Sequence, residues 1–167
     1  MKNFKHGVMV IVLLAITVFI SRFNVETYVL KVFIVFSVLL ASFNLIFRKS
    51  LVFKNYFTSK YNVLTSKFHS EKTYDISEDL MFQKVIEIIN DSKFKVAKID
   101  KMKLEILATS PISFTSWGET LYISFDENSN GSTMKFCSVS LFGMYSWGRN
   151  ETNYNGMLRL VEDSLTV

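Results

Sequence analysis

Two apolar runs near the start of the chain constrain its fold more than any other feature. The second run, Tyr28 to Phe47, has twenty residues, and a helix of that length spans about 30 Å, the thickness of the hydrocarbon core of a bilayer. The first run, Gly7 to Ile20, reaches a similar length if it extends from Phe4 to Phe23. A cleaved signal peptide is the alternative for the first run, although no small-x-small cleavage site follows it. Together the runs predict a transmembrane helical hairpin over residues 1–48.

The distribution of basic residues predicts the side of the membrane on which the chain ends lie. Residues 1–70 hold nine Lys or Arg and one acid, and of these bases only Arg22 and Lys31 lie on the turn side of the hairpin. By the positive-inside rule, both termini are expected in the cytoplasm. The single cysteine also fits a reducing compartment. We therefore expect a multi-pass protein of the bacterial inner (cytoplasmic) membrane, with cytoplasmic N- and C-termini.

The composition changes after the hairpin. Residues 49–74 mix aromatic side chains with lysines and are expected to form a juxtamembrane linker, either an interfacial helix or a continuation of the second apolar helix. Residues 71–167 hold ten bases and fourteen acids, so the net charge of +4 comes from the N-terminal part of the chain. The remaining residues, 75–167, are sufficient for one compact cytoplasmic domain.

Hydrophobic periodicity predicts two helices and four strands in this domain. One helix is expected to begin at Ser77 and to end near residues 90–92, and a second is expected over about residues 150–165. Between them, strands are expected at residues 94–99, 104–109, 121–125 and 133–142. The predicted fold class is α+β: an N-terminal transmembrane helical hairpin followed by a two-layer domain of four mostly antiparallel strands flanked by two helices.

The tripeptide Ser-Trp-Gly occurs twice, at residues 116–118 and 146–148, and contains both tryptophans of the chain. Each copy is expected where a strand meets a loop, which would place the two corners on one rim of the sheet. There, tryptophan faces could stack on a base, and a basic side chain with a helix start could hold a phosphate. The candidate ligand-binding residues are Trp117, Glu119, Trp147, Arg149, Asn150 and Asn153. Alternatively, both tryptophans are core anchors, both glycines fill positive-φ positions, and Glu119 pairs with Arg149.

The sequence contains no catalytic signature. Both histidines, His6 and His69, lie beside the apolar segments, which excludes a histidine-based triad or zinc site within residues 75–167. Neither a Walker A sequence nor a dinucleotide fingerprint is present. Cys137 lies in an apolar strand pattern and is expected to fill the core. We therefore expect no enzymatic activity, no catalytic residues, no metal and no cofactor.

A short chain with two N-terminal apolar helices, an inside-facing domain and no catalytic residues resembles the small two-transmembrane-helix effector of type III CRISPR systems that binds cyclic oligoadenylate. The resemblance implies a homo-oligomeric effector of antiviral defence whose cytoplasmic domain binds this cyclic nucleotide and perturbs the lipid bilayer through its helices. DNA binding is not expected. The alternative is a non-enzymatic membrane accessory or immunity protein that tethers or blocks a protein partner.

Overall fold

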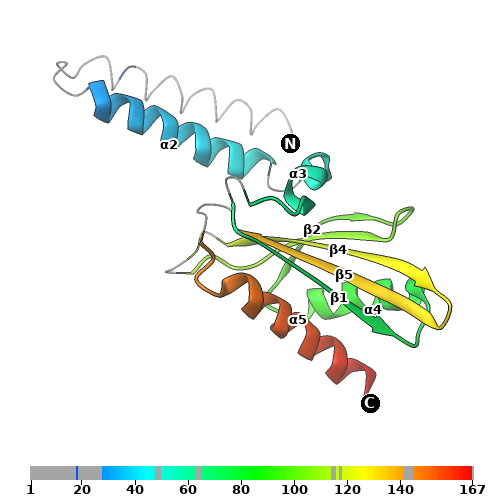
Figure 1. Cartoon of the computed structure of the whole chain (residues 1–167). Helices are drawn as coiled ribbons and strands as arrows, with labels where there is room; N and C mark the ends of the chain where they lie inside the picture. The colour runs from blue at the N-terminus through cyan, green and yellow to red at the C-terminus, as the bar shows by residue number, and fades with distance from the viewer. Residues whose placement is uncertain are drawn as a thin grey trace. The chain divides into compact units, whose positions relative to one another are not determined.

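A computed structural model of the chain describes residues 18, 28–47, 50–62, 65–113, 116, 118–140 and 145–166 (Figure 1). The chain divides into two compact units, Met1–Arg48 and Lys49–Val167.

Apart from Val18, the described part of the first unit is the helix α2, Tyr28–Phe47. Its sequence contains neither proline nor glycine and carries one charged residue, Lys31, so nothing interrupts the helix. Large apolar side chains along it are exposed, namely Tyr28, Val29, Leu30, Val32, Phe33, Val35, Phe36 and Leu39. Nevertheless, within the residues that the structure describes, no helix combines the length and the apolar character needed to cross a membrane.

This finding corrects the predicted hairpin and the conclusions that depended on it. The second apolar run forms a helix but does not qualify as a membrane span, and the first run, apart from Val18, lies outside the described residues together with the turn at residues 21–27. The predicted multi-pass location in the bacterial cytoplasmic membrane is therefore wrong. So are the two predicted functions that required it, the bilayer-perturbing effector and the membrane accessory or immunity protein. An apolar run of helical length predicts a helix in apolar surroundings, but it does not identify those surroundings.

The second unit is built on a five-stranded antiparallel sheet (Figure 1). Across the sheet the strands follow one another in the order β1 (Lys67–Tyr74), β5 (Gly131–Ser140), β4 (Glu119–Asn128), β3 (Glu105–Thr109) and β2 (Lys95–Asp100). The first strand in the sequence therefore pairs with the last, while β2 to β5 form a meander. Pairing with β5 fixes the register of β1.

The sheet has one strand more than predicted, and the additional strand is β1. It lies at the edge of the sheet, and most of its residues are polar and exposed or half-buried. Charged residues are common on edge strands, where they discourage pairing with another chain. The strand lies in the segment that the sequence assigned to a linker, because it lacks the alternation of apolar and polar residues that marks a half-buried strand. The predicted fold class is thus wrong both in its hairpin and in its number of strands.

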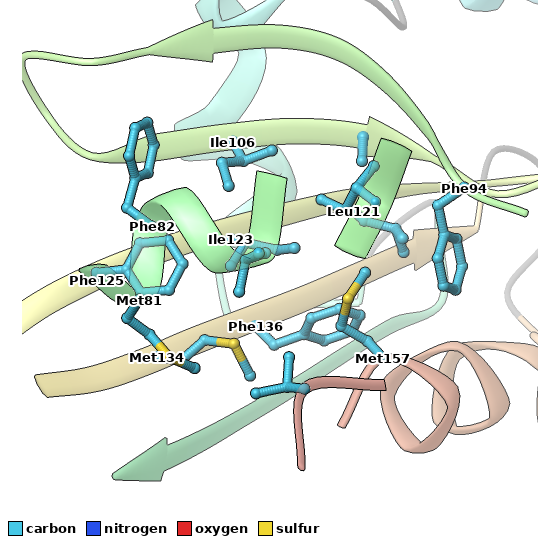
Figure 2. Close-up of a cluster of buried hydrophobic side chains, with 14 of the residues drawn as sticks. Met81, Phe82, Phe94, Ile106, Leu121, Ile123, Phe125, Met134, Phe136 and Met157 are labelled. Atoms are coloured by element: carbon cyan, nitrogen blue, oxygen red, sulfur yellow. The ribbon is translucent and has the colours of Figure 1, made fainter. Parts of the chain in front are cut away.

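Two helices cover one face of the sheet: α4 (Glu78–Asn90) and α5 (Arg149–Leu165). Acidic residues in the first turn of α4, Glu78 and Asp79, favour the start of that helix. Figure 2 shows side chains from the strands and both helices meeting between the two layers. The core contains Tyr74, Met81, Phe82, Val85, Ile89, Phe94, Ile106, Ala108, Leu121, Ile123, Phe125, Met134, Phe136, Met157 and Val161.

The other face of the sheet is covered by a short segment that we call the strap, residues Leu51–Thr58. It consists of the 3-10 turn η1 (Leu51–Phe53) and the helix α3 (Lys54–Thr58). Its buried side chain, Phe57, packs in a second cluster with Leu107, Tyr122, Cys137 and Val139. Two helices therefore cover one face of the sheet, and the strap covers part of the other.

Candidate functional site

The structure places Glu119, a predicted ligand-binding residue, in the interior. It begins β4 and is fully buried. Its carboxylate accepts hydrogen bonds from the hydroxyls of Ser110 and Ser116, and from the side-chain amide of Asn153 at 2.9 Å. Buried carboxylates need such donors because losing water is costly for a charged group. The arrangement joins the first Ser-Trp-Gly corner to helix α5.

Asn150 belongs to a second buried set of polar groups. Its side-chain oxygen accepts a hydrogen bond of 2.8 Å from the Ser138 hydroxyl. Its amide nitrogen donates to the backbone oxygen of Ser66 at 3.2 Å and to the hydroxyl of the same residue at 3.3 Å. Asn150 thus ties the first turn of α5 to β5 and to the residue before β1.

The remaining predicted ligand-binding residues are not joined to these two buried sets of polar groups by the hydrogen bonds described above. Trp147 is 81% exposed and adopts a left-handed backbone with φ of 50°, so it is not a core anchor. The following residue, Gly148, has φ of 74°, in the region that glycine tolerates best. Arg149 is half-buried, and its Nε atom has no hydrogen-bond partner among the described residues. Trp117 lies outside the described residues. Whether any of the six binds a ligand stays a prediction.

A pocket of about 270 Å³ lies elsewhere, between the strap and the sheet. None of the six predicted residues lines it. Its walls include the strap residues Leu51, Lys54 and Thr58, together with Lys60 and strand residues of the outer face. Sequence reasoning missed this pocket because it depends on how a distant segment packs on the sheet.

Strand register explains the floor of the pocket. Cys137 on β5 is paired with Tyr122 on β4 and with His69 on β1. Directly paired residues of neighbouring strands point to the same face of a sheet, so these three side chains form a row beneath the strap. A second row of pairs runs parallel to it and contains Glu105, Ser124, Lys135 and Glu71. Polar residues alternating with the core positions of β4 and β5 were the available signal for such a surface.

Tyr122 is the most deeply buried polar group of the floor. It is 4% exposed, and its ring stacks on Phe57 with 5.9 Å between ring centroids. Its hydroxyl has no hydrogen-bond partner among the described residues. Burial raises the pKa of this hydroxyl above its ordinary value, and Cys137 acts in the same direction. The hydroxyl therefore stays protonated and remains a hydrogen-bond donor.

Cys137 is a buried and unreactive thiol. Its Sγ lies 3.6 Å from the backbone oxygen of Phe57 and 3.9 Å from Nε2 of His69. Burial raises the pKa of the thiol to about 12, although Lys67 acts against this rise. A neutral thiol is a poor nucleophile and a poor metal ligand. Among the described residues, no group of three or more His, Cys, Asp or Glu side chains is arranged to hold a metal ion.

His69 stands at the exposed end of the row. Loss of hydration lowers the pKa of its imidazole, while a hydrogen bond with the backbone of Ser59 acts in the opposite direction. The positive charges of Lys67 and Lys60 lower this pKa further. The imidazole is therefore neutral near pH 7, with one N–H donor.

The charged groups at the rim are mostly paired. Lys54 forms an ion pair with Glu105, which fastens the strap to β3. Lys67 donates hydrogen bonds to the backbone oxygens of Tyr56 at 2.8 Å and of Tyr61 at 2.7 Å, which fastens the strap to β1. These contacts hold the roof of the pocket over its floor.

Comparison with known proteins adds information on the fold alone. The sequence matches no protein-family model, and no curated protein is significantly similar to it. Among solved structures, the crystal structure of Ara h 8.0201 is similar to this chain, with a TM-score of 0.50 and 9% sequence identity. The similarity covers 61% of this chain and 98% of that chain. The architecture thus resembles a Bet v 1-like fold.

The comparisons give no support to the predicted role in CRISPR antiviral defence, which depended on the membrane architecture and is corrected with it. The resemblance to that effector family is not tested by any of them. The predicted partners, a cyclic oligoadenylate and further copies of the chain, also stay predictions.

Proposed function

We propose that the second unit is a non-enzymatic binding domain that holds a small molecule in the pocket beneath the strap. The observation that supports this function is the Tyr122 hydroxyl, which is buried and unpaired on a residue that lines the pocket. A buried hydroxyl without a partner costs about 1–3 kcal/mol. A ligand that accepts its hydrogen bond would remove this cost, which favours binding.

Tyr122 differs from the other buried groups without a hydrogen-bond partner by its position at the pocket. Six buried side-chain atoms in the described part of the chain lack a hydrogen-bond partner, and of these residues only Tyr122 lines the pocket. Tyr74, for example, is a buried tyrosine with an unpaired hydroxyl, but it belongs to the core on the other face of the sheet. Among the described residues, Tyr122 is therefore the one that both lines the pocket and carries a buried, unpaired hydroxyl.

The position and size of the pocket suit a small ligand. Buried apolar side chains pack between the sheet and helices α4 and α5 (Figure 2), whereas the pocket of about 270 Å³ lies on the outer face beneath the strap. Pockets for drug-sized ligands are about 300–1,000 Å³ in volume. The occupant is thus a compact metabolite.

The chemistry of the floor supports binding without catalysis. The Cys137 thiol and the Tyr122 hydroxyl are both kept protonated by burial. His69 is neutral, and its Nε2 lies 3.9 Å from the thiol, so it does not hold a thiolate there. These groups donate hydrogen bonds but do not supply a nucleophile.

A screen of compact polar metabolites against the full chain tests this function, with ligand-observed NMR for detection and calorimetry for affinity. Because one hydrogen bond is lost, Tyr122→Phe should weaken the best ligand about tenfold. Tyr74→Phe is the matched control and should bind as the original chain does. If no compound binds, or if both variants bind equally well, the pocket is not the site.

A further inference from the structure

We propose a second binding site on this domain, in a groove between helix α5 and the segment that joins α4 to β2, and we infer that it takes a small organic dianion. The groove has a volume of about 620 Å³. Residues 92–94 of the joining segment form one wall, and α5 residues between positions 152 and 160 form the other. Among the described residues, none lines both this groove and the pocket beneath the strap. The inference therefore goes beyond the proposed function and does not depend on it.

The charge of the groove is unbalanced. Its described lining contains two basic residues, Lys93 and Arg159, and no acidic residue. Both bases are exposed, and neither forms an ion pair within the described part of the chain. Glu162, three residues after Arg159 on α5, pairs instead with Lys72 at 3.2 Å. The groove thus presents two positive charges with no counter-charge in its described walls.

The end of α4 does not use the charge of Lys93. The backbone oxygen of Ile89, in the last turn of α4, accepts hydrogen bonds from the backbone N–H of Ser92 at 3.3 Å and from its hydroxyl at 2.9 Å. This carbonyl is therefore capped without a lysine. The Nζ of Lys93 lies over the ring of Phe94, 5.4 Å from its centroid, which favours one position of the ammonium group beside the groove.

Gly156 keeps the groove open. It lies in the interior of α5, where a glycine costs about 1 kcal/mol relative to alanine. Its backbone is helical, and a Cβ atom there would meet nothing within 4 Å. Neither backbone geometry nor close packing among the described residues therefore requires a glycine. Because Gly156 lines the groove, a larger side chain would extend into it. An occupant that needs this space accounts for the glycine.

The lining indicates the class of ligand. Two unpaired cations match a ligand with two negative charges, which a phosphate monoester and a dicarboxylate both carry near neutral pH. Arginine binds either group through paired hydrogen bonds, and lysine adds a point charge. Asn155 contributes an exposed amide, and Leu160, 38% exposed, offers apolar surface to the carbon atoms of the ligand. The volume also lies within the range of about 300–1,000 Å³ that is typical of small-molecule sites.

Four compounds that share one aromatic ring test the charge requirement. Phenyl phosphate and phthalate are dianions at about pH 7.5, whereas phenyl sulfate and benzoate are monoanions. Each is titrated into the isotopically labelled full chain at constant ionic strength and followed by protein-observed NMR. We expect a dianion to bind at least about tenfold more tightly than its monoanionic counterpart, with the largest shifts at residues 92–94 and 152–160. The tighter of the two dianions shows whether the charges belong to one phosphoryl group or to two carboxylates.

Variants of the lining locate the site. Arg159→Gln and Lys93→Gln should each weaken the preferred dianion about tenfold, whereas Lys101→Gln, the same change at an exposed turn residue, should not. Gly156→Leu should abolish binding because its side chain occupies the groove. Its melting temperature should not fall, since leucine is a better helix former than glycine. Loss of binding without loss of stability separates obstruction of the groove from unfolding.

The outcomes that would overturn the inference are specific. They are equal affinity for dianions and monoanions, equal weakening by Lys101→Gln and Arg159→Gln, undiminished binding by Gly156→Leu, and failure of all four compounds to bind. None of these results bears on the proposed function, which is tested at Tyr122. Because Tyr122 does not line the groove, Tyr122→Phe should bind the dianions as the original chain does.

Discussion

The side-chain amide of Asn153 donates a hydrogen bond of 2.9 Å to the carboxylate of Glu119, and both residues are buried. The bond joins the second turn of α5 to the first residue of β4. It thereby ties the helix to the sheet in addition to the apolar contacts of Met157 and Val161 with the core.

Replacing Asn153 should therefore destabilise the domain. Asn153→Ala removes a hydrogen-bond donor from a buried carboxylate, so the free energy of unfolding should fall by about 1.5–3 kcal/mol. Asn155→Ala, at an exposed position on the same helix, should change it by less than about 0.5 kcal/mol. Urea denaturation followed by circular dichroism measures both. Equal effects at the two positions would show that the buried bond does not stabilise the fold.

Ser138 and Asn150 should be energetically coupled. Their hydrogen bond of 2.8 Å is buried, and Asn150 also reaches Ser66. In a double-mutant cycle with Ser138→Ala and Asn150→Ala, we expect a coupling free energy of about 0.5–3 kcal/mol. Thermal or urea unfolding of the four proteins provides the cycle. Additive effects would mean that the two side chains stabilise the domain independently.

Cys137 should resist alkylation while the domain is folded. The pKa of its thiol rises from an ordinary value of 9.0 to about 12 on folding. At pH 9 about half of the unfolded thiol is ionised, whereas only about a thousandth of the folded thiol is ionised. Iodoacetamide labelling, followed by mass spectrometry, should be slow in buffer and fast in urea. Equally rapid labelling under both conditions would contradict the burial of the thiol.

The same shift predicts lower stability in base. The folded state favours the neutral thiol, so this contribution is complete below pH 9 and is lost as the pH rises from 9 towards about 12. Its slope is at most about 1.4 kcal/mol per pH unit. Cys137→Ala should reduce that slope around pH 9, where Tyr74 and Tyr122, whose ordinary pKa is 10.0, contribute less. Urea denaturation at a series of pH values tests this, and identical slopes would disprove it.

Two glycines should respond oppositely to alanine. Gly156 lies within α5, and a Cβ atom there would meet nothing within 4 Å. Gly156→Ala should therefore raise the free energy of unfolding by about 0.4–1 kcal/mol. At Gly131, φ is 145° and a Cβ atom would lie 2.2 Å from the backbone oxygen of Tyr74, so Gly131→Ala should be destabilising. Melting temperatures of the two variants test this, and a shift in the same direction for both would contradict the prediction.

Local patterns predict the elements whose two faces meet different environments. Leu121, Ile123 and Phe125 alternate because one face of β4 meets the core, and the same kind of pattern marks the helices. The strand β1 is missed because its place is set by pairing with β5, some sixty residues later in the sequence. No local pattern records a partner so distant.

Less of the candidate site than of the fold could be predicted from the sequence. The repeated tripeptide led to Glu119, Asn150 and Asn153, but their burial depends on how α5 docks on the sheet. The pocket depends on Phe57 packing against Tyr122, a contact between a short helix and the middle of the sheet. Such long-range packing is not expressed in spacing or composition.

The strap begins only three residues after Arg48, at which the first unit ends. A ligand in the pocket touches both the strap and the sheet, so detaching the strap requires releasing the ligand. By thermodynamic linkage, the free energy of that detachment increases with ligand concentration as RT ln(1 + [L]/Kd). Under the proposed function, ligand concentration thereby sets the free energy that holds the strap on the sheet.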